Sequence, residues 1–151
     1  MKFRKMMGVT AAFLCAALAL SGCGSTDETA YRIGIVQQDE HSSLDAATQG
    51  FEDKLMELLG EENVTFDYQN AQGEQANCTT IATKFVSDGC DLILANGTTA
   101  LQSAAAATAD IPIVGTSVTD YIAAGAVNSN EKPGTNVTGV SDLGEIKAQV
   151  D

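Results

Sequence analysis

Short apolar runs alternate along this chain with longer segments in which apolar residues recur every three or four positions. The short runs predict strands, and the periodic segments predict amphipathic helices. We expect strands at 31–37, 64–68, 92–95, 111–115 and 137–140. We expect helices at 44–59, 75–88 and 100–108, and a short helix or turn at 121–127. This alternation predicts a parallel sheet with right-handed crossovers.

The predicted fold class is α/β: a doubly wound, parallel five-stranded sheet of the flavodoxin-like type, with strand order 2-1-3-4-5. The strand at 64–68 alternates between apolar and polar residues, which suits a sheet edge. In such sheets ligands bind beyond the carboxyl ends of the strands, at the switch point between the first and third strands. The loops at 37–43 and 96–99 flank that point, and the loop at 116–120 lies beside them.

Capping residues predict where two of the helices begin. Ser42 or Ser43 can cap the first helix, and Gly60 is expected at its end. The strand at 92–95 runs through Asn96-Gly97 into a helix that Thr98 or Thr99 can cap. The free backbone N–H groups of such a helix start form a site for an anion.

The first thirty residues carry the pattern of an export signal. Lys2, Arg4 and Lys5 precede an apolar run at 6–20, which is short for a membrane span and typical of a signal peptide. The run ends in Leu20-Ser21-Gly22-Cys23, which resembles the bacterial lipobox, whose cysteine is lipidated. We expect a lipoprotein signal peptide at 1–22 and a tether at 23–30, anchored by lipid on Cys23. An ordinary secretion signal with a chance cysteine is the alternative.

Charge and cysteine content narrow the function classes. Beyond Cys23 there are 20 acidic and five basic residues, which argues against nucleic acid and against direct binding of anionic lipid. Cys78 and Cys90 bracket a predicted helix and should lie roughly 15–18 Å apart, too far for a disulfide. We therefore expect two free thiols. The single histidine, His41, gives no metal cluster, and no cofactor is expected.

Three enzyme or signalling classes lack their motifs. There is no dinucleotide-binding or P-loop glycine motif, and Asp39 and Glu40 after the first strand would repel phosphate. A phosphoacceptor receiver domain needs an aspartate where Asn96 stands and a lysine directly after the fifth strand. A hydrolase needs a nucleophile with a base, and no G-x-S-x-G occurs. We expect a protein that is not an enzyme.

Six segments resemble those of one known family. They are Ile33–Gln37, Asp67–Gly73, Ile93–Asn96, Ile111–Val114, Val118–Asp120 and Lys132–Asp142. In combination they resemble the substrate-binding lipoproteins of ABC importers, in the branch often described as tryptophan/tyrosine transporter substrate-binding proteins. Tyr121 stands where a proline is frequent and Thr135 where a glycine is common. Tyr121 is expected at the rim of the cleft, where it could influence the choice of ligand.

The resemblance implies a type I periplasmic binding protein, in which two flavodoxin-like lobes joined by a hinge close on a ligand. Family chains are about twice this length. The sequence therefore looks like the N-terminal lobe only, at 31–143, with the start of a crossover helix at 144–151 where the chain stops. It could be a fragment or a truncated gene product.

The function that the resemblance implies is capture of a small polar ligand, an aromatic amino acid, for an ABC permease. The expected partners are that permease and the membrane, through the lipid on Cys23, at the outer face of the cell membrane or the periplasmic side of a membrane. The competing hypothesis is an anchored interaction or sensor module that binds no small molecule. In either case the expected location is extracytoplasmic.

Eight residues are expected to bind the ligand. They are Gln37, Glu40, Asn96, Thr98, Thr99, Ser117, Thr119 and Asp120. The hydroxyls of Thr98 and Thr99, with the N–H groups of Ala100 and Leu101, suit a carboxylate at a helix N-terminus. Thr98 could equally serve only as a helix cap.

The remaining members of this set suit the other polar groups of an amino acid. Asp120, or alternatively Glu40, suits the ammonium group. Gln37, Ser117 and Thr119 stand at strand ends, where they can hydrogen-bond polar groups. Asp120 could instead cap the turn that follows it.

Overall fold

The structure, a computed structural model, describes residues 30–142 of the 151-residue chain. The predicted signal peptide, the lipidation at Cys23, nearly all of the tether and the predicted crossover helix lie outside the described residues.

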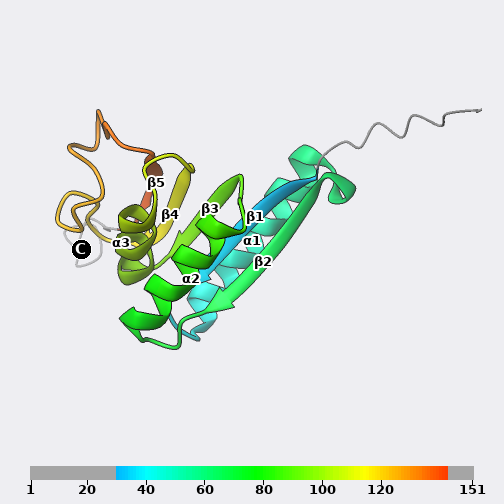
Figure 1. Cartoon of the computed structure of the whole chain (residues 1–151), viewed down its shortest axis with the longest axis horizontal. Helices are drawn as coiled ribbons and strands as arrows, with labels where there is room; N and C mark the ends of the chain where they lie inside the picture. The colour runs from blue at the N-terminus through cyan, green and yellow to red at the C-terminus, as the bar shows by residue number, and fades with distance from the viewer. Residues whose placement is uncertain (1–29, 143–151) are drawn as a thin grey trace, which may run out of the picture.

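Strands and helices alternate through the described part of the chain (Figure 1). The order is β1 (Tyr31–Gln37), α1 (Ser42–Leu59), the 3-10 turn η1 (Glu61–Asn63), β2 (Val64–Asn70), α2 (Gln75–Ser87), β3 (Leu92–Asn96), α3 (Thr98–Ala107), β4 (Ile113–Val118) and β5 (Val137–Ser141). The strands form one sheet in the order β2-β1-β3-β4-β5, and each neighbouring pair is parallel. The predicted fold class and strand order are confirmed.

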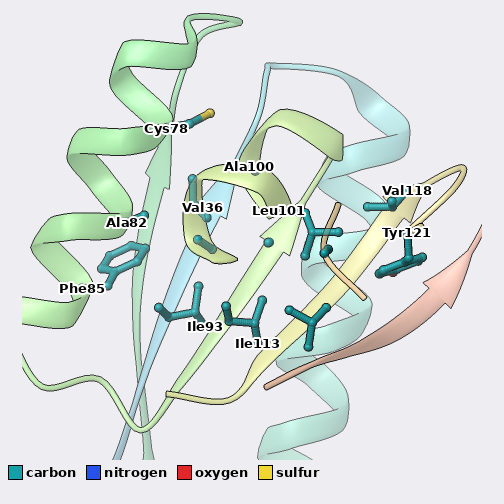
Figure 2. Packing of buried hydrophobic residues seen from close by; sticks show 14 of the residues in the cluster. Val36, Cys78, Ala82, Phe85, Ile93, Ala100, Leu101, Ile113, Val118 and Tyr121 are labelled. Carbon is teal, nitrogen blue, oxygen red and sulfur yellow. The ribbon is translucent and has the colours of Figure 1, made fainter. Parts of the chain in front are cut away.

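Helices cover both faces of this sheet, with α2 and α3 on one side and α1 on the other (Figure 1). Successive strand residues point to opposite faces, so Ile33 and Ile35 pack on the α1 side while Val36 packs on the α2–α3 side. Figure 2 shows Ile93 and Ile113 beneath α2 and α3, with Phe85 of α2 close by. The central strands are buried on both faces, as parallel strands in this architecture are.

The carboxyl ends of the strands line up at one edge of the sheet. Gln37 at the end of β1 pairs with Asn70 of β2 and Asn96 of β3. Asn96 in turn pairs with Thr116 of β4. β2 is an edge strand of the sheet, as predicted. Because the chain runs from β1 outward to β2 and then returns to β3 on the other side of β1, the switch point falls between β1 and β3.

The predicted N-caps of two helices are wrong. α1 begins at Ser42 and its N-cap is His41, whose Nδ1 accepts from the N–H of Ser43 at 3.2 Å. α3 begins at Thr98, and Gly97 is its N-cap, without a side-chain cap bond from that residue. In both cases the helix begins at the first of the two predicted caps, which places the serines and threonines inside the first turn.

β4 runs from Ile113 to Val118 rather than over 111–115. Ile111 is held in the turn after α3, since its N–H donates to Thr108 Oγ1 at 3.1 Å. At the other end Ser117 has a φ of 56°, which forms a local irregularity. Val118 then rejoins the ladder opposite Ser141, so Ser117 belongs to the strand and not to the loop after it.

The two cysteines beyond the predicted anchor, Cys78 and Cys90, are buried and free. Burial raises the pKa of both thiols. Among the helices within residues 30–142, none combines the length and the apolar character that a membrane crossing requires.

Candidate functional site

Backbone hydrogen bonds join the loops at the carboxyl edge of the sheet. The N–H of Gln38, directly after β1, donates to the carbonyl of Asn96 at 2.9 Å. The N–H of Gly97, directly after β3, donates to the carbonyl of Thr116 at 3.0 Å. The first residues of these loops therefore continue the ladder and have fixed positions relative to one another.

Beneath this edge lies a buried polar network that includes two predicted site residues, Gln37 and Asn96. Both are 0% exposed. Thr48 of α1 joins them: its Oγ1 donates to Gln37 Oε1 at 2.8 Å and accepts from Asn96 Nδ2 at 3.0 Å. Gln37 Nε2 donates to Asp45 Oδ1 at 2.7 Å, and Asn96 Nδ2 also donates to the carbonyl of Leu44 at 2.8 Å. The network ties the ends of β1 and β3 to the first turns of α1.

One atom of this network has no partner. Asn96 Oδ1 is buried and lacks a hydrogen bond within the described part of the chain. Exchanging the amide oxygen and nitrogen would set an oxygen 2.8 Å from the carbonyl of Leu44, two acceptors in contact, so the orientation is fixed by chemistry. A buried acceptor without a donor costs about 1–3 kcal/mol. The end of β3 therefore holds one buried acceptor that no described donor satisfies.

The start of α3 is occupied by a side chain that the sequence analysis did not single out. Gln38 Oε1 accepts from the N–H of Thr99 at 2.9 Å. Gly97 makes room for it: a Cβ on Gly97 would lie 2.7 Å from both Cβ and Oε1 of Gln38, and the φ of Gly97 is 111°. Gln38 follows directly after a strand that ends at the switch point. That position in the sequence could have identified it as a candidate site residue.

Thr98 and Thr99 are half-buried and lie in the first turn of α3. The N–H of Leu101, one of the two donors expected to meet an anion, instead donates to the carbonyl of Gly97 at 2.9 Å. The N–H of Thr99 also has a partner, Gln38 Oε1. The first turn of α3 therefore has fewer free N–H groups for an anion than the sequence predicts.

The predicted residues after β4 lie on a separate stretch of the edge. Asp120 is exposed, and its Oδ1 accepts from the N–H groups of Ile122 and Ala123, each at 2.9 Å. The carbonyl of Thr119 accepts from Ser141 Oγ at 2.7 Å. Asp120 therefore caps the turn with one carboxylate oxygen and keeps the other for a further contact.

Glu40 is exposed in the loop between β1 and α1, where its N–H donates to Asp39 Oδ1 at 2.8 Å. Ser117 is half-buried at the irregularity in β4. Of the eight predicted residues, the structure brings Gln37 and Asn96 into the same network. Thr98 and Thr99 adjoin that network through Gln38, while Glu40 and Asp120 lie on different loops.

Tyr121 does not lie at a cleft rim as expected. It is 7% exposed and belongs to the core on the α3 side (Figure 2). Its hydroxyl donates to the carbonyl of Val140 at 3.0 Å, and its ring lies over the paired glycines Gly115 and Gly139. Burial raises its pKa above the ordinary value of 10.0. Tyr121 therefore joins β4 to β5, and it also lines a hollow of about 250 Å³ beside β5.

A small hollow of about 210 Å³ lies on the α1 side of the network. Its lining residues are Gln37, Asp45, Thr48, Gln49, Glu52 and Tyr68. Burial and, secondarily, the neighbouring Asp53 raise the pKa of Glu52. Residues 30–142 contain no group of three or more His, Cys, Asp or Glu side chains arranged to hold a metal ion. The arrangement at this edge offers amide and hydroxyl hydrogen bonds.

A sequence model of the family described as ABC transporter substrate binding protein matches residues 32–151. This chain belongs to that family. The match confirms the resemblance inferred from the sequence motifs. Members of the family bind substrates for transport, and the relatives described next are likewise substrate-binding proteins rather than enzymes.

Three relatives with known names or structures are similar over most of this chain. A tyrosine-binding protein of Clostridioides difficile (strain R20291) is 41% identical over 157 residues, which cover 93% of this chain and 45% of that protein. The ligand-free, open structure of a substrate-binding protein with adhesive properties from Clostridium difficile matches with a TM-score of 0.75 and 46% identity, over 78% of this chain and 40% of that chain.

The third relative is the ABC domain from Streptococcus pneumonia in complex with L-Trp. It matches with a TM-score of 0.71 and 38% identity, over 75% of this chain and 39% of that chain. The chain thus spans less than half the length of each of these relatives.

Proposed function

We propose that this chain is the ligand-capturing N-terminal lobe of an extracytoplasmic solute-binding lipoprotein of an ABC importer, and that its ligand is an aromatic amino acid. The observation that carries the proposal is the 41% identity, over 93% of the chain, to a protein named for binding tyrosine. The similarity to a domain found in complex with L-Trp points to the same ligand class.

The geometry of the carboxyl edge supports capture of a small polar molecule. A parallel doubly wound sheet binds ligands where the strand order reverses, which here is between β1 and β3. The residues that reach this point carry hydroxyl and carboxamide groups on short loops. Such groups suit the carboxylate and ammonium of an amino acid, and the aromatic side chain would be contacted mainly by a second lobe.

Individual roles follow from the contacts already described. The hydroxyl groups of Thr98 and Thr99 would contact the ligand at the start of α3, and Ser117 lies at the irregularity in β4. The second carboxylate oxygen of Asp120 would take the ammonium group, with Glu40 as the alternative and Thr119 beside it. Gln37 and Asn96, both fully buried, would hold the strand ends in place.

The lipid anchor and the importer are part of the proposal because the sequence motif at 20–23 and the family support them. A lipid on Cys23 would hold the protein at the outer face of a membrane, where it would deliver ligand to a permease. The competing function, an anchored interaction module without a ligand, draws support from the adhesive properties named for one relative.

The test compares two forms of the protein in a thermal-shift screen. One is residues 24–151, and the other joins residues 24–142 to the second half of the C. difficile tyrosine-binding protein, giving a two-lobed form. Each is screened against the twenty amino acids and simple sugars, with the C. difficile protein as the positive control.

We expect tyrosine, tryptophan or phenylalanine to raise the melting temperature of the two-lobed form, because a ligand that binds only the folded state stabilises it. The single lobe should respond little, since it offers half of the contacts. If no amino acid shifts the two-lobed form while the control responds, the proposed ligand class is wrong and the interaction module becomes the better description.

A further inference from the structure

Gln38 occupies the centre of the switch point and is held there by its backbone. Its N–H donates to the carbonyl of Asn96 at 2.9 Å, and its own carbonyl accepts from the N–H of Gly73 at 2.8 Å. These bonds tie it to the end of β3 on one side and to the loop after β2 on the other. The residue is half-buried, so its side chain adjoins both the interior and the surface of this edge.

The side chain of Gln38 occupies the start of α3. Its Oε1 accepts from the N–H of Thr99 at 2.9 Å. Exchanging the amide oxygen and nitrogen would set two donors against each other, so Oε1 must be the atom that faces the helix. A ligand carboxylate placed at this N–H group would first have to displace Gln38.

The other branch of the same carboxamide is a donor without a described partner. Nε2 diverges from Oε1 and has no hydrogen bond to any residue in the range 30–142. The bond that Thr99 gives to Oε1 polarises the amide and makes its N–H groups better donors. The partial positive charge at the N-terminus of α3 therefore favours a negatively charged partner at Gln38 Nε2.

A second unpartnered group lies at the neighbouring strand end. Asn96 is 0% exposed and its Oδ1 has no donor among the described residues. Its Nδ2 donates to the carbonyl of Leu44 and to Thr48 Oγ1, so only Oδ1 of this carboxamide is unpaired. The end of β3 therefore holds a second polar group that no described residue satisfies, beside the strand end that positions Gln38.

We infer that Gln38 is a ligand-contact residue whose Nε2 donates to the carboxylate of the bound amino acid, so that α3 acts on the ligand through Gln38 rather than through its own N–H groups. This inference rests on the proposed function. It names the group of the ligand that this residue recognises, and it assigns Gly97 the role of leaving space for the Gln38 side chain.

The experiment measures affinity in the two-lobed form by calorimetry. The ligands are L-tryptophan and L-tryptophanamide, which replaces the carboxylate by a neutral amide. Gln38→Ala removes the contact, while Gln38→Glu keeps an acceptor for the N–H of Thr99 but turns a carboxylate toward the ligand. Gln102→Ala, which removes an exposed glutamine of α3 bonded to the carbonyl of Ala124, is the matched control.

We expect Gln38→Ala to weaken L-tryptophan binding roughly tenfold to a hundredfold, the loss for a hydrogen bond to a charged group. Binding of L-tryptophanamide should change much less. Gln38→Glu should weaken L-tryptophan binding at least as strongly without lowering the melting temperature, since a carboxylate also caps a helix start. Gln102→Ala should bind like the unchanged protein.

Two results would overturn the inference while leaving the proposed function intact. Tighter binding by Gln38→Ala would mean that Gln38 competes with the ligand for the N–H of Thr99. Equal affinity, or an equal loss for both ligands, would mean that Gln38 only supports the helix. If the unchanged two-lobed form binds no amino acid while the C. difficile parent does, the proposed function fails and this inference fails with it.

Discussion

Replacing Thr48 by valine tests whether the buried network holds the carboxyl edge together. Valine has nearly the shape of threonine, so packing at this 6%-exposed position is retained while the hydroxyl is lost. Gln37 Oε1 then loses its 2.8 Å donor and keeps only the 3.4 Å contact with Asn96 Nδ2. Asn96 Nδ2 loses its 3.0 Å acceptor on Thr48.

The magnitude follows from leaving two buried polar groups poorly paired. Each such loss costs about 1–3 kcal/mol, and because each group keeps one contact, Thr48→Val should lower the free energy of unfolding by about 2–4 kcal/mol. Thr48→Ser is the matched control, because it keeps the hydroxyl and removes one methyl group at about 1 kcal/mol. A buried polar network of this kind is expected to be more sensitive to a lost hydroxyl than to a lost methyl.

The assay is urea unfolding of residues 24–151, a range that contains every residue of the two core clusters. With a urea dependence of about 2 kcal/mol/M, the midpoint for Thr48→Val should fall by roughly 1–2 M and that for Thr48→Ser by less than half as much. If valine proves as stable as serine, or more stable, the network does not stabilise the lobe and the reasoning is refuted.

Three further substitutions test the packing around the sheet. Tyr121→Phe removes the hydrogen bond to the Val140 carbonyl and should cost about 1 kcal/mol of stability at neutral pH. Because burial raises the pKa of Tyr121 above 10.0, this tyrosine ionises more readily in the unfolded chain, so the native protein should lose stability above pH 10 and the variant should lose less. Urea midpoints at pH 8 and above pH 10 would measure this difference. Gly34→Ala should cost about 1–3 kcal/mol, because its Cβ would lie 2.6 Å from the Phe85 ring. Gly50→Ala, with no atom within 4 Å, should instead stabilise α1 by about 0.5–1 kcal/mol, and equal midpoints for these two alanine variants would contradict the packing argument.

The sheet could be predicted from sequence because its strands are buried on both faces. Leu92 to Ala95 is an apolar run too short for a helix, and β1 carries Ile33, Ile35 and Val36 in the same way. Once five such runs alternate with helices, right-handed crossovers leave few orders for the strands. The order and the carboxyl edge follow from patterns that each occupy a few consecutive residues.

The cap of α3 and the place of Tyr121 could not be predicted because contacts between distant segments decide them. Gly97 caps α3 because the side chain of Gln38, 59 residues earlier in the chain, packs where a Cβ on Gly97 would lie. Tyr121 was expected at a cleft rim, yet it lies over Gly115 and Gly139, which become neighbours only when β4 pairs with β5. No local pattern announces such a pairing.

Part of the predicted site could be inferred from the sequence, and part could not. Gln37 and Asn96 were expected at the edge, and they do lie together there. Their burial could also have been anticipated, since each follows two apolar residues at alternate positions of its strand and so faces α1. By the same alternation Gln38 must face away from α1, and that makes it the more accessible of the two glutamines.

This difference in burial divides the residues of the edge into two groups with separable effects. Substitutions of Gln37, Thr48 or Asn96 act on hydrogen bonds that hold β1 and β3 against α1, so they should lower stability first and ligand affinity only as a consequence. Gln38 and Asp120 make contacts to backbone N–H groups from partly or fully exposed positions, so substitutions there should change affinity while the lobe stays folded. Plotting affinity against the free energy of unfolding for such variants would therefore distinguish residues that contact the ligand from residues that position them.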